Sequence, residues 1–351
     1  MFSVIVSTKR NSASYFKYDF QQEFEDKDNL TKESTEVQST EETKNEEKLF
    51  SESPVQDFVP QRDCKFMLFT RLNPDEADIL VLDDIKSVKN SYFNEKLPVR
   101  FLIHGWLDHG DGMLGQLGRK AYLQKGAFNV ISLDWSVGAD TPNYFKARSA
   151  IFQVGPFLAK FIDFLVEKTN ISTSDIYLIG HSLGAHIAGI AGKTVTKLKI
   201  PVIYGLDPAG PMFFTWQPRE RLDVHDAKYV EVLHTSYQGF GKPIGYADFY
   251  ANGGKVQPGC NLLTSCSHMR SISYWSESIN SETGFYGVPL EDNEAFDDTF
   301  DIERKAVMMG GEPGNLGKAR GSYKLETHAT YPYAMGPLEY SEEVTEQTRF
   351  S

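Results

Sequence analysis

The sequence predicts an α/β fold in which a mostly parallel central sheet is covered by helices on both faces. From about residue 64 onward, short apolar runs alternate with stretches of helical periodicity. The apolar runs are continuous rather than alternating, as expected for strands that are buried on both faces of a parallel sheet. With 351 residues, 40% of them hydrophobic and 24% charged, the chain has the composition and length of a globular protein with a large core.

The elements follow one another as strand, helix, strand over most of the chain. Apolar runs predict strands at 65–70, 79–82, 99–103, 129–133, 176–179, 201–206, 229–233 and 322–325. Apolar residues three and four apart predict a core-facing helix over 145–168, in which Gly155-Pro156 favours a kink or a fresh helix start. Helices are also expected at 185–192 and 269–279. No apolar run approaches the roughly 18 residues that a membrane-spanning helix needs.

The N-terminal residues differ from the rest in composition. Residues 21–52 include 11 acidic and 4 basic residues and almost no aliphatic ones, which predicts a disordered tail over 1–55. An acidic tail that docks a basic partner is the alternative. The apolar run 2–6 is shorter than that of a signal peptide, and Lys9 and Arg10 follow it, so the sequence contains no convincing signal peptide. We expect one folded domain at 56–340 and a short tail at 341–351.

The sequence GHSLG at 180–184 has the pattern and the context of a nucleophile elbow, because it follows a predicted strand and precedes a predicted helix. A sharp strand-to-helix turn strains the serine backbone, and Gly180 and Gly184 relieve the crowding on either side. The turn lifts the Ser182 hydroxyl above the sheet at a helix N-terminus. The alternative is a chance match in a glycine-rich chain. With this context, the motif predicts a serine nucleophile in an α/β-hydrolase fold.

A serine hydroxyl needs a histidine base and an orienting carboxylate, which in this fold follow the serine in the order acid, histidine. Asp207 is the best acid because it ends a predicted strand 25 residues after the serine, whereas Asp134 ends a strand that precedes it. Four histidines follow Asp207, namely His225, His234, His268 and His328. Spacing ranks His268 first, since it opens a helical stretch after a loop. Spacing alone leaves His234 and His328 as alternative candidates for the base.

Four motifs complete the pattern: HGW at 104–106, GHSLGAH at 180–186, GLDPAGP at 205–211 and CSHMRS at 266–271. In this order they resemble the animal lipase family typified by pancreatic lipase, which includes lipoprotein lipases, phospholipases A1 and inactive yolk proteins. The resemblance covers about residues 66–334 and implies that Ser182, Asp207 and His268 form a catalytic triad. It also implies that the N–H of Trp106 joins that of Leu183, the residue after the nucleophile, in an oxyanion hole.

The resemblance also bears on the cysteines. Cys260 and Cys266 stand where family members have a disulfide that brackets a lid over the active site, and two buried thiols are the alternative. Only five residues separate them, and the segment 234–246 is short as well. Both features resemble the phospholipase A1 branch rather than the triglyceride lipases. Cys64 has no evident partner.

Residues 221–226 resemble the calcium loop of the family, in which two aspartates and two backbone carbonyls hold a structural ion. Asp223 and Asp226 are then either ligands of a calcium ion or solvated surface charges, since two carboxylates are few for calcium without backbone oxygens. We assign no metal, and no organic cofactor is implied.

The resemblance implies a serine esterase that hydrolyses acyl esters of lipids, and we expect cleavage at the sn-1 position of phospholipids. Triacylglycerol hydrolysis is the first alternative, and a non-catalytic lipid-binding module like the yolk proteins, which lack the nucleophile, is the second. The expected partner is a phospholipid or glyceride at an aggregate or membrane surface, because a net charge of −12 disfavours nucleic acid. Since the chain ends at residue 351, we expect no colipase-binding β-sandwich domain. The implied location is extracellular.

Overall fold

The computed structural model describes residues 2–6, 14–18, 57–290 and 306–337, which belong to two compact units, Met1–Phe58 and Val59–Ser351. In the first unit, strand β1 (Phe2–Val6) pairs with strand β2 (Ser14–Tyr18) in antiparallel register. The tail expected over 1–55 thus contains a strand pair, because these two segments are rich in the aromatic and β-branched residues that favour strands. The acidic stretch 21–52 and the tail expected at 341–351 lie outside the described residues.

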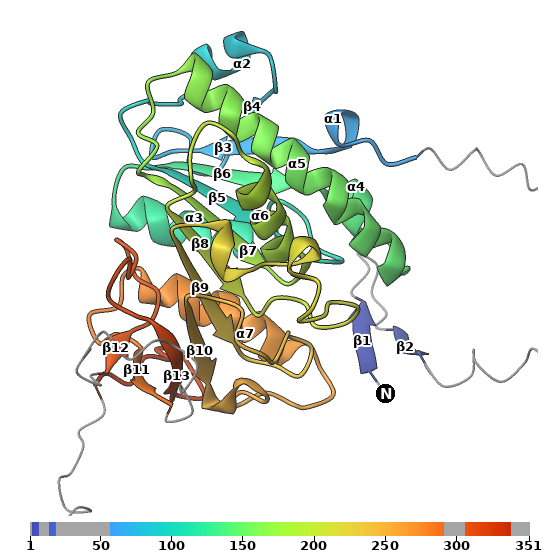
Figure 1. Ribbon diagram of the computed structural model, residues 1–351, viewed down its shortest axis with the longest axis vertical. Coiled ribbons are helices and arrows are strands. Elements are labelled where there is room, and N and C mark those ends of the chain that lie inside the picture. The colour runs from blue at the N-terminus through green and yellow to red at the C-terminus, as the bar shows by residue number, and fades with distance from the viewer. Residues whose placement is uncertain (1, 7–13, 19–56, 291–305, 338–351) are drawn as a thin grey trace, which may run out of the picture. The chain divides into compact units, whose positions relative to one another are not determined.

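The second unit is built on one sheet. Its strands are β3 (Lys65–Phe69), β4 (Asp78–Leu80), β5 (Val99–Ile103), β6 (Asn129–Asp134), β7 (Ile176–His181), β8 (Val202–Leu206), β9 (Tyr229–His234), β10 (Ala247–Ala251), β11 (Tyr286–Pro289), β12 (Val307–Met308) and β13 (Gly321–Leu325). Within the described residues, the strands lie in the order β12-β11-β13-β10-β9-β8-β7-β5-β6-β3-β4 (Figure 1). The strands from β13 to β6 are parallel, and antiparallel strands extend the sheet at both edges. The predicted α/β class is confirmed.

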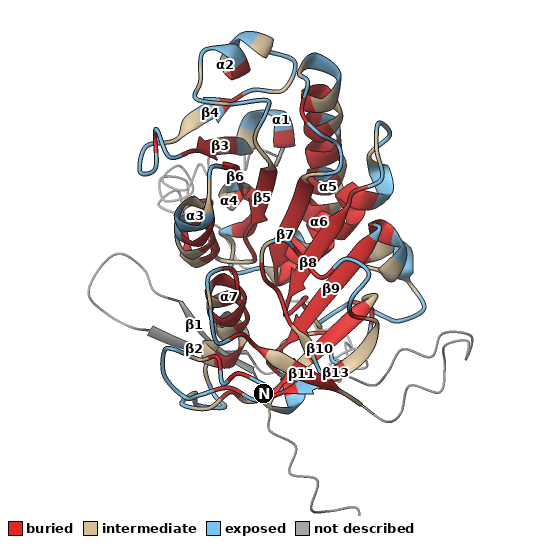
Figure 2. Cartoon of the chain, turned by 90° about the vertical axis from the view of Figure 1, so that its left-hand side faces the viewer, coloured by how far each residue is buried: buried red, intermediate tan, exposed pale blue. Residues whose placement is uncertain are grey.

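Helices cover both faces of this sheet (Figure 2). Helices α5 (Tyr144–Lys168) and α6 (Leu183–Thr194) lie on one face, and α3 (Met113–Lys125) and α7 (Cys266–Ser278) lie on the other. Strands β5, β7 and β8 are buried at every residue, which explains their continuous apolar sequences. The connections contain short helices α1 (Pro60–Asp63), α2 (Ile85–Lys89) and α4 (Ser136–Ala139) and the 3₁₀ helices η2 (Pro218–Glu220), η3 (Val224–Asp226) and η4 (Asn252–Gly254).

Helix α5 continues through Pro156, so the fresh helix start that the sequence allowed there does not occur, while the kink stays a prediction. Twelve residues of α5 are buried, so packing outweighs the backbone hydrogen bond that proline removes. Gly155 allows close approach to α6, because a Cβ there would lie 2.5 Å from Ile190 Cγ2. By length and composition α5 could also cross a membrane, but 61% of its apolar stretch is buried inside the protein, as in a core helix.

Two elements near the site are absent from the sequence expectations. Helix α3 has little apolar periodicity and contains Gly115 and Gly118, which lower helix propensity. A Cβ on Gly118 would lie 3.0 Å from Leu102 Cδ1, so this glycine lets α3 pack closely on β5. Strand β10 is short and contains Asp248, a residue type depleted in strands. Packing and a buried partner for Asp248 therefore override the local preferences.

Candidate active site

Ser182 lies in a sharp turn between β7 and α6, as the elbow motif predicts. Its backbone has φ 56° and ψ −121°, which residues with a side chain rarely adopt. The turn is possible because glycines flank it. A Cβ on Gly180 would lie 2.3 Å from the carbonyl oxygen of Gly184, and one on Gly184 would lie 2.1 Å from that of Ile103. The elbow thus presents Ser182, which is 9% exposed, at the carboxyl edge of the parallel strands.

The parallel sheet places Asp207 beside the serine. His181 and Leu206 are partners in the β7–β8 register, so the next residues, Ser182 and Asp207, lie at neighbouring strand ends. The Ser182 N–H donates to the Leu206 carbonyl (3.1 Å), and the Asp207 N–H donates to the Leu233 carbonyl (2.7 Å). These hydrogen bonds continue the strand pairing past the last strand residues. They therefore fix the nucleophile and the acid to the edge of the same sheet.

His268 comes from the first turn of α7, and its imidazole meets the acid. Nδ1 of His268 lies 2.7 Å from Oδ2 of Asp207, which is fully buried. Since a carboxylate only accepts, Nδ1 carries the proton and Nε2 is free to take one. The structure therefore brings Asp207 and His268 together as an orienting acid and a base, at the strand edge that carries Ser182.

His181, the residue before the nucleophile, contacts the base directly. Its ring centroid lies 4.4 Å from that of His268, and its Nε2 lies 3.3 Å from the His268 carbonyl oxygen. Burial, together with the nearby His268, holds the pKa of His181 well below its usual value. The neutral His181 ring therefore packs beside His268 without adding a charge.

Ser236 is a site residue that no sequence motif indicates. Its hydroxyl donates to Asp207 Oδ2 and lies 3.5 Å from His268 Nδ1. The backbone N–H groups of Thr235 and Ser236 donate to Asp207 Oδ1 at 2.8 and 3.2 Å. A Cβ on Gly239 would lie 2.3 Å from the same oxygen, so the loop after β9 wraps closely around the acid. Because β9 pairs with β8, residues that follow β9 lie beside Asp207 at the end of β8. A polar residue just after β9 is therefore the signal that could have indicated Ser236.

The other candidate histidines lie elsewhere. His234 is buried, with Nε2 2.8 Å from Asp248 Oδ1 and its ring stacked on Tyr250, as a structural histidine at a strand end. His328 is exposed, and so is His225, whose Nδ1 lies 2.8 Å from Asp223 Oδ1. Of the four histidines that follow Asp207, His268 is the one whose ring meets this carboxylate.

The two predicted oxyanion donors also lie at this edge. Leu183 is the first residue of α6, and the first N–H groups of a helix have no acceptor within it. Trp106 follows β5, and a Cβ on the adjacent Gly105 would lie 2.8 Å from Ser182 Cβ, so this turn passes close to the nucleophile. The Trp106 indole donates to the Thr141 carbonyl and packs on Tyr144. These contacts hold the turn that passes close to the elbow.

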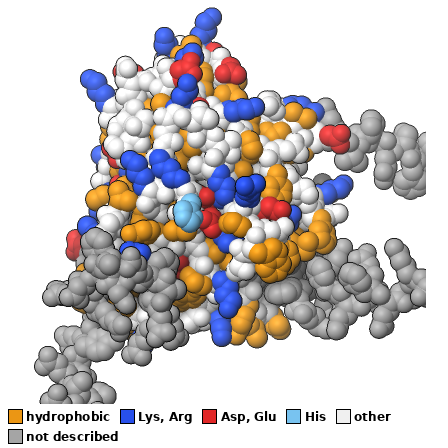
Figure 3. Space-filling model, in the orientation of Figure 1, with side chains coloured by type: hydrophobic (Ala, Val, Ile, Leu, Met, Phe, Trp, Pro, Cys, Tyr) orange, Lys and Arg blue, Asp and Glu red, His pale blue; other side chains and the backbone are white. Residues whose placement is uncertain are grey.

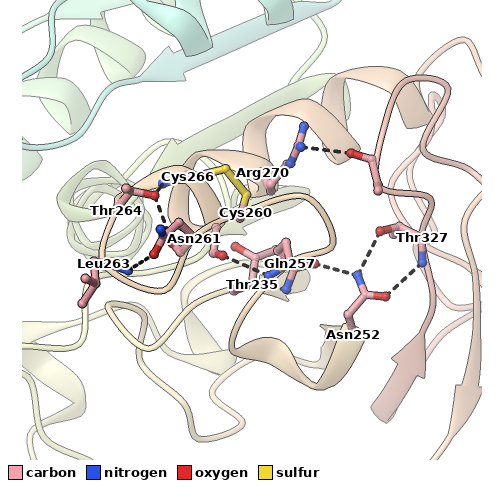
Figure 4. The surroundings of a disulfide bond; sticks show 12 residues. Thr235, Asn252, Gln257, Cys260, Asn261, Leu263, Thr264, Cys266, Arg270 and Thr327 are labelled. Atoms are coloured by element: carbon pink, nitrogen blue, oxygen red, sulfur yellow. Dashed lines mark hydrogen bonds between the residues drawn. A yellow bond between two sulfur atoms is a disulfide. The ribbon is translucent and has the colours of Figure 1, made fainter.

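The predicted disulfide between Cys260 and Cys266 is present (Figure 4). It closes a short loop whose tip carries Leu262 and Leu263, 62% and 66% exposed. The base of the loop is held by Gln257, whose side chain donates to the Thr235 and Ala251 carbonyls. Cys64 is the free cysteine of the described chain, and burial raises the pKa of its thiol.

The chain has relatives among known proteins. A family model described as "Lipase" matches residues 28–333. The chain is 37% identical to pancreatic lipase-related protein 2 of Cavia porcellus over 281 residues, 76% of this chain and 64% of that protein, so it spans less than two thirds of that relative's length. It is 39% identical to the probable phospholipase A1 magnifin of Vespa magnifica over 255 residues, 67% of this chain and 74% of the relative. Among solved structures, an alpha/beta hydrolase enzyme from a Medee basin deep-sea metagenome library gives a TM-score of 0.28 at 17% identity, covering 49% of this chain and 69% of that one.

Proposed function

Because the chain belongs to the lipase family, we propose that it is a serine esterase that hydrolyses the sn-1 acyl ester of phospholipids. The observation that supports this chemistry is the hydrogen bond between Asp207 and His268. This pair lies at the sheet edge that also carries Ser182 in its strained turn. This set of side chains is the one that acyl transfer through a serine nucleophile requires.

The reaction proceeds in two acyl-transfer steps. His268 Nε2 takes the Ser182 proton as Oγ attacks the acyl carbonyl, and the N–H groups of Trp106 and Leu183 bind the resulting oxyanion. Asp207 holds the imidazole in its tautomer and stabilises the imidazolium. The leaving lysophospholipid alcohol receives the proton from His268, and the acyl group stays on Ser182. Water, deprotonated by His268, then releases the fatty acid, and the serine regains its proton. No organic cofactor takes part in these steps.

Two observations support a phospholipid as the substrate. The loop between Cys260 and Cys266 is only five residues long and is closed by a disulfide. A short lid leaves room for a charged head group beside the scissile ester and needs little rearrangement at an interface. The probable phospholipase A1 magnifin is among the relatives of this chain.

Exposed apolar side chains support action at a lipid surface. Leu262 and Leu263 lie at the lid tip, and Phe145, Met212 and Trp216 are exposed as well. Phe145 follows Tyr144, which packs on Trp106 and donates to the Pro211 carbonyl next to Met212. The face in Figure 3 likewise shows hydrophobic patches between charged groups. Apolar insertion supplies lipid affinity that a net charge of −12 does not. We also propose an extracellular location, because disulfides such as Cys260–Cys266 persist in oxidising compartments.

The test is a phospholipid vesicle whose sn-1 and sn-2 acyl chains differ, assayed beside a triglyceride emulsion, with Ser182→Ala as the background control. We expect release of the sn-1 chain, weaker triglyceride hydrolysis and no product from Ser182→Ala. Strong triglyceride turnover without release of the sn-1 chain would identify a triacylglycerol lipase. Failure of an active-site phosphonate to label Ser182 in the folded protein would favour a non-catalytic lipid-binding module.

A further inference from the structure

The segment 221–226 resembles a calcium loop, and the chemistry of its oxygens decides whether it fits such an ion. Calcium takes 6–8 oxygen ligands at about 2.3–2.6 Å, usually with several carboxylates among them. The segment has two carboxylates, those of Asp223 and Asp226, and the Arg221 carbonyl shares an ammonium donor with Asp226. Within the described residues there is no group of three or more His, Cys, Asp or Glu side chains that could hold a metal.

A lysine already occupies the place between these oxygens. Lys193 lies in the last turn of α6, and its Nζ donates to the Arg221 carbonyl (2.8 Å) and to Asp226 Oδ2 (2.5 Å). The Asp226 side chain is 2% exposed, so its charge has little water to solvate it. The ammonium therefore provides the positive charge that a buried carboxylate and a carbonyl need at this place.

The second carboxylate is also engaged. Asp223 Oδ2 accepts from Arg221 Nη1 (3.2 Å), while Oδ1 accepts from the His225 N–H (3.2 Å) and lies 2.8 Å from its Nδ1. Asp226 Oδ2 accepts from the Asp223 N–H as well (2.8 Å). With Lys193 in place and cationic or N–H donors on both carboxylates, these residues do not fit a calcium ion.

Close packing explains why a lysine reaches this place. A Cβ on Gly192 would lie 2.5 Å from the Asp226 carbonyl oxygen, and one on Gly189 would lie 2.7 Å from Asp226 Oδ2. These glycines bring α6 against the loop. On the same helix, His186 accepts from the Leu222 N–H (3.1 Å) and contacts the Ala209 carbonyl (2.9 Å).

We propose that the Lys193 ammonium takes the place of a structural divalent cation, so that the chain folds and works without calcium. Through these hydrogen bonds, the ammonium connects α6, which begins directly after the nucleophile, to the segment 221–226, which follows Asp207 in the chain. Removal of the lysine side chain leaves a cavity beside the buried Asp226 carboxylate and a free carbonyl. Without the ammonium, the Asp226 carboxylate and the Arg221 carbonyl are free to bind a cation whose other ligands are water, so the variant becomes sensitive to calcium where the natural chain is not.

The first measurement uses the unchanged protein. We compare its melting temperature after EDTA treatment and after addition of millimolar CaCl₂, and we titrate calcium by calorimetry. The expected result is the same melting temperature in both and no binding heat. A melting temperature that rises by several degrees with calcium would overturn the proposal, whatever the protein hydrolyses.

The second measurement uses Lys193→Ala, with Lys199→Ala as the matched control. Lys199 is exposed and donates to the His225 carbonyl of the same loop, but it does not contact Asp226. We expect Lys193→Ala to melt several degrees lower in EDTA and to recover with calcium, and Lys199→Ala to behave like the unchanged protein. A Lys193→Ala variant that is fully stable in EDTA, or one that is destabilised but does not recover, contradicts the proposal. If this variant does not fold, the calcium response of the unchanged protein decides.

Discussion

Removal of the Ser236 hydroxyl should slow the chemistry without weakening substrate binding. In Ser236→Ala, Asp207 Oδ2 loses one of the two donors that meet it and keeps His268 Nδ1. A hydrogen bond to a charged group contributes about 1.5–3 kcal/mol. Two backbone donors remain on Oδ1, so we take the lower end of this range. Since about 1.4 kcal/mol corresponds to a factor of ten, kcat should fall roughly tenfold.

The assay is the initial rate on a soluble short-chain ester, with kcat and KM determined separately and the melting temperature recorded. Ser267→Ala is the matched control, because the Ser267 hydroxyl accepts the Gln257 N–H (2.9 Å) next to His268 without touching Asp207. It should lower stability and leave kcat unchanged, while Ser236→Thr should keep most of the activity. An unchanged kcat in Ser236→Ala, or an equal loss in Ser267→Ala, would refute the positioning role.

Three further results are expected. Ser182→Ala and His268→Ala should each lower kcat by roughly 10⁴ to 10⁶, and the double variant should be scarcely worse, because the residues act as one unit; turnover like that of the natural chain in folded His268→Ala would move the base to His234 or His328. Cys260→Ser/Cys266→Ser should lower the free energy of unfolding by at most about 2–3 kcal/mol, since the closed loop is short; denaturant unfolding measures this, and a larger loss would show that the disulfide holds more than its own loop. Burial lowers the pKa of His186 to about 3, so the folded state binds fewer protons than the unfolded state, and stability should fall as the pH drops below about 6.5. In His186→Gln, the free energy of unfolding should depend less on pH in this range. An unchanged slope would show that another group causes the pH dependence.

The parts of the site that the sequence predicts are those with local determinants. The elbow at Ser182 depends on the two glycines two residues away, and Asp207 ends its own strand, so short motifs suffice. Ser236 has no such motif, since it meets Asp207 only because β9 pairs with β8. Lys193 resembles any solvated lysine at a helix end until the loop after β8 folds back on it. Contacts between distant segments are therefore what the sequence pattern does not contain.

The same limit applies to the fold. Continuous apolar runs predict β5, β7 and β8 because burial on both faces leaves a direct trace in composition. The uninterrupted course of α5 through Pro156 is set by its packing on α6, which no local preference encodes. Helix α3 likewise depends on close contact with β5, which Gly118 allows. Tertiary packing outweighs local propensity at each of these places.

The disulfide between Cys260 and Cys266 has a consequence for how this site can be altered. The bond fixes both ends of the loop, with Cα atoms 5.5 Å apart, and His268 follows two residues later on α7. Residues inserted between the two cysteines would therefore change only the loop that the disulfide closes. The His268 imidazole would keep its hydrogen bond to Asp207. The loop is a replaceable module: segments of different length and polarity could be exchanged there to select substrates, with the acyl-transfer chemistry left as it is.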